Sequence, residues 1–418
     1  MNLWNETKSI PISRTMIWEA YKKVRANKGS AGVDGLSMKQ FDANRSKHLY
    51  KLWNRMASGS YFPPAVKEVE IPKKDGSNRK LGIPTISDRI GQMAIKDYIE
   101  PRLEKIFSPN SYGYRPHKNA HQALKSVRTN CWKTDWVIDL DIKGFFDNIS
   151  HEKLMLAVAQ HVPENWIKLY IQRWLVCPVL TKSGNIIQKA GKGTPQGGVI
   201  SPLLANLFLH YAFDKWLEKT NSTIIYSRYA DDVIVHCRSQ NEAEQTLKAI
   251  KQRMTEVGLE LHPKKTKIVY CRDSRRKGSY PEVKFDFLGY SFQPRDTASK
   301  NGKGMFLGYD CAISIRSRKA IADKLGELKV EKMTYKSIVG IAQRLNPMIR
   351  GWINYYGKFR ISMLHKVFRL LNQRLIRWGR KRYKRYKTSI NRASKWLQRV
   401  QEQYRYLFYH WQLGFIYS

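Results

Sequence analysis

The segment TIIYSRYADDVIVHC, from Thr223 to Cys237, constrains the fold of this chain more than any other. Two β-prone apolar arms flank a short Tyr-Ala-Asp-Asp break, which predicts a tight β-hairpin with Asp231 and Asp232 at its tip. Two adjacent carboxylates framed by apolar residues need a compensating cation when they are partly buried. A divalent metal site is therefore one interpretation of this hairpin, and an ordinary aspartate-rich turn exposed to water is the other.

A third carboxylate is expected close to the hairpin. The segment WVIDLDI, residues 136–142, alternates like a half-buried strand, and Asp141 lies near its end before two phenylalanines. Three aspartates suit Mg²⁺, and two such ions can activate an attacking hydroxyl and stabilise a leaving phosphate in nucleotidyl transfer. Asp139 and Asp147 are rival candidates, since Asp139 and Asp141 share one face of a strand.

The charge of the chain points to a polyanionic partner. Its 75 Lys and Arg residues outnumber 34 Asp and Glu, which gives a net charge of +41. Positive charge of this size supplies sequence-independent affinity for nucleic acid, whereas an anionic membrane is the competing partner. No apolar run reaches the ~20 residues of a membrane span, and the N-terminus lacks the apolar core of a signal peptide. Nucleic acid is therefore the expected partner.

The five cysteines are odd in number, widely spaced and never in a C-x-x-C pair. This pattern argues against a disulfide framework and against a zinc module. We therefore expect a reducing compartment, the cytoplasm.

The two ends of the chain differ in character. Two polar breaks, residues 272–281 and 293–304, separate a mixed α+β part from a part that is helical from about Ile313 onwards. Residues 332–418 contain 20 Lys and Arg but only one acid, Glu402, and aromatic residues lie between the cations. This mixture is typical of a nucleic-acid groove.

A helical bundle with an aromatic core and a solvated basic face is the alternative. For Trp352, Tyr356 and Trp378 taken individually, we predict core positions.

Several motifs in chain order resemble reverse transcriptases, specifically the group II intron-encoded kind that combines polymerase with RNA maturase activity. They are KGSAGVDG, RKLGIPTISDRIGQMAI, SYGYRP, DIKGFFDNISH, GTPQGGVISPLLANLFL, YADD, LHPKKTKIV and FDFLGYSF. The resemblance extends over nearly the whole chain.

This resemblance implies a right-hand polymerase: an α+β fingers and palm region with an antiparallel palm sheet, followed by an all-helical thumb, the maturase domain X. The expected domains are an N-terminal extension and start of the fingers (1–65), fingers and palm (66–295), a linker (296–312), the thumb (313–386) and a short basic DNA-binding segment (387–418). No Cys and His endonuclease module is expected after it.

The resemblance also assigns the metal ligands. It places them at Asp141, Asp231 and Asp232, with two Mg²⁺ ions for which Mn²⁺ can substitute, and makes Asp139 structural. Lys265 matches the lysine proposed to protonate the leaving pyrophosphate.

The incoming nucleotide has its own expected contacts. Phe146 matches the aromatic steric gate that excludes a ribose 2′-OH, with an ordinary core phenylalanine as the alternative, and Phe145 is expected to pack in the core. Lys73 and Arg79 match residues that clamp the triphosphate. Gln196 matches the residue that touches the template-primer and the nucleotide.

The expected partners are intron RNA as template, the RNA/DNA primer-template duplex, target DNA and dNTPs. No membrane partner is expected, and both a monomer and a homodimer are compatible with the sequence. The expected location is a bacterial cytoplasm or nucleoid. The residues expected to contact nucleic acid are Lys28, Arg115, Arg350, Lys358, Arg380, Lys381 and Arg382.

The leading functional hypothesis is a polymerase that binds its intron RNA, assists splicing and copies the RNA into DNA during retromobility. One alternative is a domesticated relative with a role in DNA repair or phage defence. The other is a maturase that only binds RNA and assists splicing.

Overall fold

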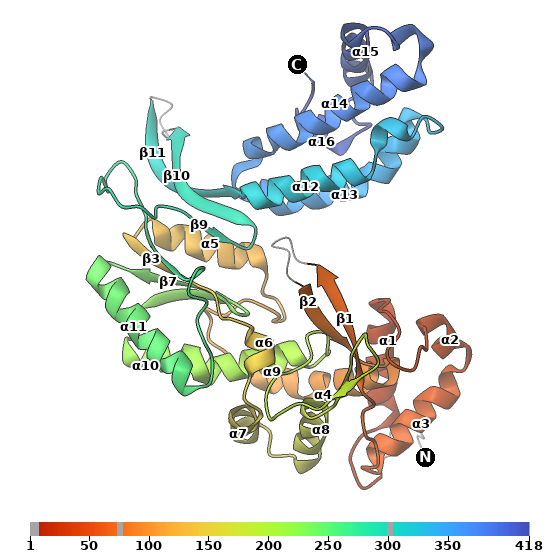
Figure 1. Cartoon of the computed structure of the whole chain (residues 1–418), viewed down its shortest axis with the longest axis vertical. Coiled ribbons are helices and arrows are strands. Elements are labelled where there is room, and N and C mark those ends of the chain that lie inside the picture. Colours follow the sequence, from red (N-terminus) through yellow and green to blue (C-terminus); the bar gives the residue numbers. More distant parts are fainter. Residues whose placement is uncertain (1–7, 73–77, 299–303, 418) are drawn as a thin grey trace. The chain divides into compact units, whose positions relative to one another are not determined.

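The structure is a computed structural model that describes residues 8–72, 78–298 and 304–417. Strands and helices are mixed up to Ile313, and only helices follow among the described residues. The α+β fold with a helical C-terminal part is therefore confirmed (Figure 1).

The chain divides into two compact units that are interleaved in sequence. The first contains Met1–Ala123 and Ile138–Lys267, and the second contains Leu124–Val137 and Ile268–Ser418. Three elements pass from one unit into the other along the chain: α5 (Ala120–Cys131), β3 (Trp136–Leu140) and β8 (Lys267–Tyr270).

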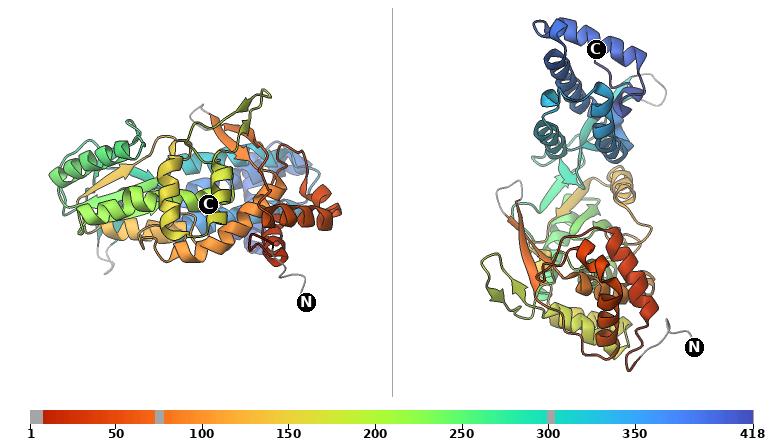
Figure 2. Two further views of the ribbon diagram at one scale, coloured as in Figure 1. Left: turned by 90° about the horizontal axis from the view of Figure 1, so that it is seen from below. Right: turned by 90° about the vertical axis from the view of Figure 1, so that its right-hand side faces the viewer.

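The first unit begins with three helices, which Figure 2 shows gathered together near the N-terminus. α1 packs against α3 and α4. The helices of this unit are α1 (Arg14–Ala26), α2 (Met38–Ala43), α3 (Arg45–Ala57), α4 (Ile86–Glu104), α6 (Phe145–Asn148), α7 (His151–His161), α8 (Asn165–Leu175), α9 (Ser201–Leu209), the π-helical η2 (His210–Asp214), α10 (Lys215–Thr220) and α11 (Gln240–Glu256).

Two four-stranded sheets organise this unit. One has the order β2-β1-β4-β5 and the other the order β6-β7-β3-β8. Besides β3 and β8, their strands are β1 (Val66–Pro72), β2 (Asn78–Ile83), β4 (Val179–Leu180), β5 (Ile186–Ile187), β6 (Ile225–Tyr229) and β7 (Asp232–Cys237). The strand predicted over residues 136–142 is β3, which ends before Asp141.

A buried carboxyl group lies at the start of α4. Thr85 caps this helix by accepting a hydrogen bond from the amide of Asp88. The Asp88 Oδ1 accepts hydrogen bonds from the Tyr61 hydroxyl at 3.0 Å and from Trp174 Nε1 at 2.9 Å. Burial raises the pKa of Asp88 to about 7, against which these two hydrogen bonds act.

The second unit combines a small sheet with a helical bundle. Its three-stranded sheet has the order β11-β10-β9, and β10 and β11 form a long antiparallel ribbon (Figure 1). Its elements are β9 (Phe285–Phe287), β10 (Tyr290–Ala298), β11 (Met305–Ile313), α12 (Ile315–Glu327), η3 (Val330–Lys332), α13 (Ile338–Arg360), η4 (Ile361–Leu364), α14 (His365–Arg382), η5 (Lys384–Tyr386), α15 (Ile390–Gln403) and α16 (Tyr409–Gln412).

Three aromatic residues test the core prediction made for this helical part. Trp378 is fully buried and donates from Nε1 to the Met333 carbonyl at 3.0 Å. Trp352 and Tyr356 are partly buried and pack against the same hydrophobic core. Their assignment to the core is confirmed.

The short segment Leu124–Val137 is fixed within the second unit by polar contacts. Arg128 makes a two-point ion pair with Asp310, at 2.5 and 3.1 Å. Arg276, which is nearly buried, donates to the carbonyls of Cys131 and Thr134 at 2.9 and 2.5 Å. These bonds span well over a hundred residues of sequence.

All five cysteines are buried, and none forms a disulfide with another. Among the helices that the structure describes, none combines the length and apolar character needed to cross a bilayer.

Candidate active site

The predicted hairpin is present and places the two adjacent aspartates at a tight turn. β6 and β7 pair antiparallel, with Tyr229 opposite Asp232, so that Ala230 and Asp231 form the turn. Ala230 has a φ of +57°, in the left-handed region that turns of this kind need. Gly113 packs so closely on this turn that a Cβ there would lie 2.4 Å from the Ala230 nitrogen. The turn is therefore held by backbone as well as by its own strands.

Asp141 follows β3 and is held by the segment that precedes β8. Its carbonyl accepts from the amide of His262 at 2.8 Å, and its amide donates to Thr266 Oγ1 at 3.4 Å. The Lys265 Nζ lies 3.3 Å from the Asp141 carboxylate. Lys265 and Asp141, separated by more than a hundred residues in sequence, thus form an ion pair.

The three aspartates influence one another electrostatically. Burial raises the pKa of Asp231, and the charge of Asp141 raises it further. Asp232 is exposed at the turn. Desolvation of its carboxylate by the surrounding protein nevertheless raises its pKa to about 7, together with the charges of Asp231 and Asp141. Lys265 opposes this increase. The site is thus a concentration of negative charge that its own cations do not fully balance.

These carboxylates fit a divalent cation in their chemistry. Oxygen ligands with excess negative charge suit Mg²⁺, and a bound cation would favour their ionised forms. Among the described residues, no three acidic, histidine or cysteine side chains stand close enough to form a complete metal site. The Asp141 carboxylate contacts Lys265 in this structure, and it would have to exchange that contact for a metal in order to act as a ligand with Asp231 and Asp232.

Arg79 and Gln196 lie together beside the aspartates. The Arg79 Nε donates to Gln196 Oε1 at 2.7 Å, and Gln196 Nε2 donates to Asp147 Oδ2 at 3.4 Å. The positive charge of Arg79 acts to lower the pKa of Asp231, so the Arg79 side chain lies near this aspartate. Two expected nucleotide contacts thus meet near the hairpin, whereas Lys73 lies outside the described residues.

Both phenylalanines that follow Asp141 are buried. Phe145 and Phe146 lie on α6 with ring centroids 5.3 Å apart, and Phe145 also contacts Phe208. Phe146 is 7% exposed and Phe145 is 2% exposed. The packing of Phe145 agrees with its expected role, and the gate at Phe146 stays a prediction.

A buried ion pair, which no sequence motif predicted, contacts the turn of the hairpin. Arg228 and Asp214 are both fully buried and form a two-point pair at 2.8 and 2.5 Å. The Arg228 Nη1 also donates to Asn206 Oδ1 at 2.9 Å and to the Ala230 carbonyl at 3.1 Å. Asn206 in turn donates to the Gly113 carbonyl at 2.7 Å. The turn that carries Asp231 is thereby tied to α9 and η2.

Comparison with known proteins identifies the family of this site. Residues 71–292, which include every residue of the site described above, match the family described as reverse transcriptase (RNA-dependent DNA polymerase). The chain belongs to the reverse transcriptase family. Residues 318–398 match the maturase-specific domain of group II introns. Reverse transcriptases use divalent metal ions, and both matches make nucleic acid, RNA included, the class of partner.

Individual relatives agree with these matches. Protein YkfC of Escherichia coli K12 is 30% identical over 65% of this chain and 78% of its own length. The group II intron-encoded protein LtrA of Lactococcus lactis is 34% identical over 46% of this chain. A 91 kDa protein in the cob intron of Schizosaccharomyces pombe is 26% identical over 84% of this chain. The matched regions cover only 32% of LtrA and 51% of the 91 kDa protein.

Most of the basic residues expected to contact nucleic acid are exposed in this reverse transcriptase. Lys28 lies in the loop after α1 of the first unit. In the second unit, exposed side chains are found at Arg350, Lys358, Lys381 and Arg382. Their positions permit contact with phosphates.

Two of the expected contacts have other partners. Arg115 is buried, because its guanidinium donates to Glu104 at 2.6 Å and to the carbonyls of Ser108 and Ser111. A side chain only 5% exposed has no surface for a phosphate, so we remove Arg115 from the nucleic-acid set. Arg380 is half-buried and donates to the Lys387 carbonyl at 3.1 Å.

Proposed function

We propose that this reverse transcriptase binds the RNA of a group II intron, assists its splicing, and copies it into DNA by two-metal nucleotidyl transfer. The observation that carries the polymerase part is the tight hairpin turn that presents Asp231 and Asp232 within a region that matches the reverse transcriptase family. The charge of Asp141 raises the pKa of both hairpin aspartates, which supports its assignment as the third ligand. Such a site is costly without cations and useful with them.

The carboxylates of Asp141, Asp231 and Asp232 would hold two Mg²⁺ ions, or Mn²⁺ in their place. When bound, such ions activate the primer 3′-hydroxyl and stabilise the negative charge on the leaving pyrophosphate. Lys265, whose Nζ lies 3.3 Å from the Asp141 carboxylate, would give a proton to that pyrophosphate. Its side chain is about half exposed, so it can turn from Asp141 toward a substrate.

The other residues of the site would orient the nucleotide. Arg79 presents a guanidinium to the triphosphate, and its hydrogen bond to Gln196 limits the directions in which it can point. Phe146 would exclude a ribose 2′-OH, and Lys73 would add a second positive charge. Together they would select and align a dNTP.

Nucleic acid would be held along basic surfaces of both units. Lys28 is proposed to contact template RNA, and the exposed Arg350, Lys358, Lys381 and Arg382 to contact intron RNA, the primer-template duplex or target DNA. Arg380 would contribute through the part of its side chain that remains accessible. Phosphate contacts of this kind weaken as salt rises.

Primer extension on an RNA template with dNTPs and Mg²⁺ tests the proposal. Wild-type protein should extend the primer, whereas Asp231→Ala and Asp141→Asn should reduce extension by at least about a hundredfold, since each removes a metal ligand. Asp139→Asn is the matched control, because Asp139 lies on β3, the strand that leads to Asp141, and is not a proposed ligand.

Folded wild-type protein that makes no product would refute the polymerase proposal. Equal losses in Asp139→Asn and Asp141→Asn would refute the assignment of the ligand.

A further inference from the structure

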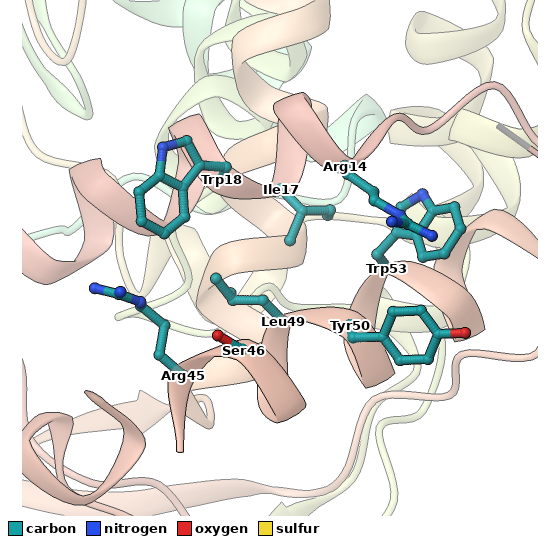
Figure 3. A pocket seen from close by; sticks show the side chains of 8 residues that line it. All are labelled: Arg14, Ile17, Trp18, Arg45, Ser46, Leu49, Tyr50 and Trp53. Atoms are coloured by element: carbon teal, nitrogen blue, oxygen red, sulfur yellow. The ribbon is translucent and has the colours of Figure 1, made fainter. Parts of the chain in front are cut away.

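A hollow lies between α1 and α3 in the N-terminal part of the first unit (Figure 3). Its volume of about 350 Å³ falls within the range of ~300–1,000 Å³ that is usual for small-ligand pockets. The proposed polymerase site uses none of its residues. It is lined by Arg14, Ile17, Trp18, Arg45, Ser46, Leu49, Tyr50 and Trp53.

The two ends of this hollow each carry a guanidinium stacked on aromatic rings. Arg45 lies 5.1 Å from the centroid of the Trp18 ring. At the other end, Arg14 lies 4.3 Å from the Trp53 ring and 5.6 Å from the Tyr50 ring. Figure 3 shows these groups at opposite sides, with aliphatic side chains between them.

The aromatic groups of the hollow differ in their accessibility. Trp53 is 2% exposed and donates from Nε1 to the Ile12 carbonyl at 2.9 Å, so it is part of the core. Tyr50 is 55% exposed, and Trp18 is partly exposed. An exposed ring beside an arginine offers a face on which a flat ligand can stack.

The charge of the surroundings favours an anion. α3 has the sequence RSKHLYKLWNRMA, which contains four Lys or Arg residues and no acid. On α1, Glu19 is paired with Lys22 at 2.7 Å. A ligand for this hollow must therefore combine negative charge with a flat apolar face.

We propose that the hollow binds one unpaired nucleotide of a nucleic-acid strand. The base would stack between the exposed rings and rest on Ile17 and Leu49, while Arg14 and Arg45 would contact the phosphates on either side. Stacking on aromatic or guanidinium planes is how unpaired bases are usually held. The identity of the strand as template or intron RNA rests on the proposed function, but the site itself needs no polymerisation.

An acidic peptide with an aromatic side chain is the competing ligand. A nucleotide is favoured because the positive groups lie on both sides of the hollow, which matches the two phosphates that flank each base. The basic helix α3, which lines the hollow, also adds positive charge that would attract a polyanion such as a nucleic-acid strand.

The test uses photo-crosslinking of the full-length protein, without dNTPs, to a short single-stranded RNA that carries 5-iodouridine. A matched DNA with 5-iododeoxyuridine identifies the source of the nucleotide. The key variant is Ser46→Trp, which fills the hollow from an exposed position and leaves both arginines in place. Arg45→Ala with Trp18→Ala removes one end of the site.

Tyr98→Ala with Arg102→Ala is the matched control, because these residues form a cation–π pair, 6.0 Å apart, outside both the hollow and the basic C-terminal part of the chain. Crosslinks should map to peptides that contain Trp18 or Tyr50, and both hollow variants should weaken binding about tenfold, as expected when base stacking is lost. The control should bind like the wild type.

An unchanged yield of the crosslink at the Trp18 or Tyr50 peptide in folded Ser46→Trp protein would overturn the proposal. Stronger competition by polyglutamate than by an RNA of equal charge would also overturn it in favour of a peptide. Asp231→Ala protein should crosslink like the wild type. A failure of this site is therefore distinguishable from a failure of the polymerase proposal.

Discussion

The buried pair of Arg228 and Asp214 yields the most quantitative prediction. Both side chains are fully buried, and Asp214 supplies two of the four acceptors that Arg228 uses. Asp214→Ala therefore leaves a buried guanidinium with an unbalanced charge, which should cost about 3–5 kcal/mol. The loss is expected in the unit that carries the hairpin.

Removing both charges should cost less than removing one. In a double variant with Asp214→Leu and Arg228→Met, the unpaired charge is gone, and only Asn206 Oδ1 and the Ala230 carbonyl lose a donor. Each lost hydrogen bond is worth about 1 kcal/mol, so a total cost near 2 kcal/mol is expected. The double variant should nevertheless extend primers poorly, because the turn before Asp231 is no longer tied to Arg228.

Native-state hydrogen exchange of the β6 and β7 amides measures the opening free energy of this region separately from the rest of the chain. Glu327→Ala is the control, since its pair with Lys324 is more than half exposed and should contribute at most about 1 kcal/mol. A change below about 1 kcal/mol in Asp214→Ala, or a double variant less stable than the single, would refute the reasoning.

Three further predictions concern other residues of the first unit. The pKa of Asp88 in the folded protein, about 7, exceeds its unfolded value. Protonated Asp88 therefore contributes fully to stability at low pH, and this contribution, at most about 4 kcal/mol, is lost as the pH rises to 7. Asp88→Asn should flatten this part of the curve of stability against pH, measured by urea unfolding. Gly113→Ala should reduce primer extension and stability, because its Cβ would meet the Ala230 nitrogen, whereas Gly351→Ala, with open space around it, should slightly stabilise its helix; equal effects would contradict the packing argument. Phe146→Ala should raise rNTP incorporation relative to dNTP by at least about tenfold, near 1.4 kcal/mol, and an unchanged ratio in single-nucleotide extension would remove the gate from this position.

Local patterns in the sequence predicted the hairpin well. The β-prone apolar arms around Tyr-Ala-Asp-Asp predicted the two strands, and the tight turn between them leaves few possible registers. Spacing could not decide between Asp139 and Asp141, since the pattern of residues 136–142 predicted both on one face of a strand. The choice required the family motif, and the effect of Asp141 on the pKa of both hairpin aspartates supports that choice.

Other features depend on contacts that no local pattern encodes. The partner of Arg228 is 14 residues earlier, at the end of a π-helical turn, and its burial depends on how α9 packs. Arg115 was expected to contact nucleic acid, yet Glu104 and two backbone carbonyls accept hydrogen bonds from its guanidinium. Charge alone could not distinguish these buried arginines from exposed ones.

The interleaving of the two units limits how relatives of this chain can exchange parts. Because Leu124–Val137 belongs to the second unit but is encoded within the first, a single crossover anywhere between these residues and Ile268 would separate the Arg128 guanidinium from its native Asp310. A functional hybrid would need either two crossovers or compatible residues on both sides. The segment is also synthesised long before the strands that it joins. We therefore expect the maturase region to be inherited together with this short upstream piece, and chimeras that omit it to fold poorly.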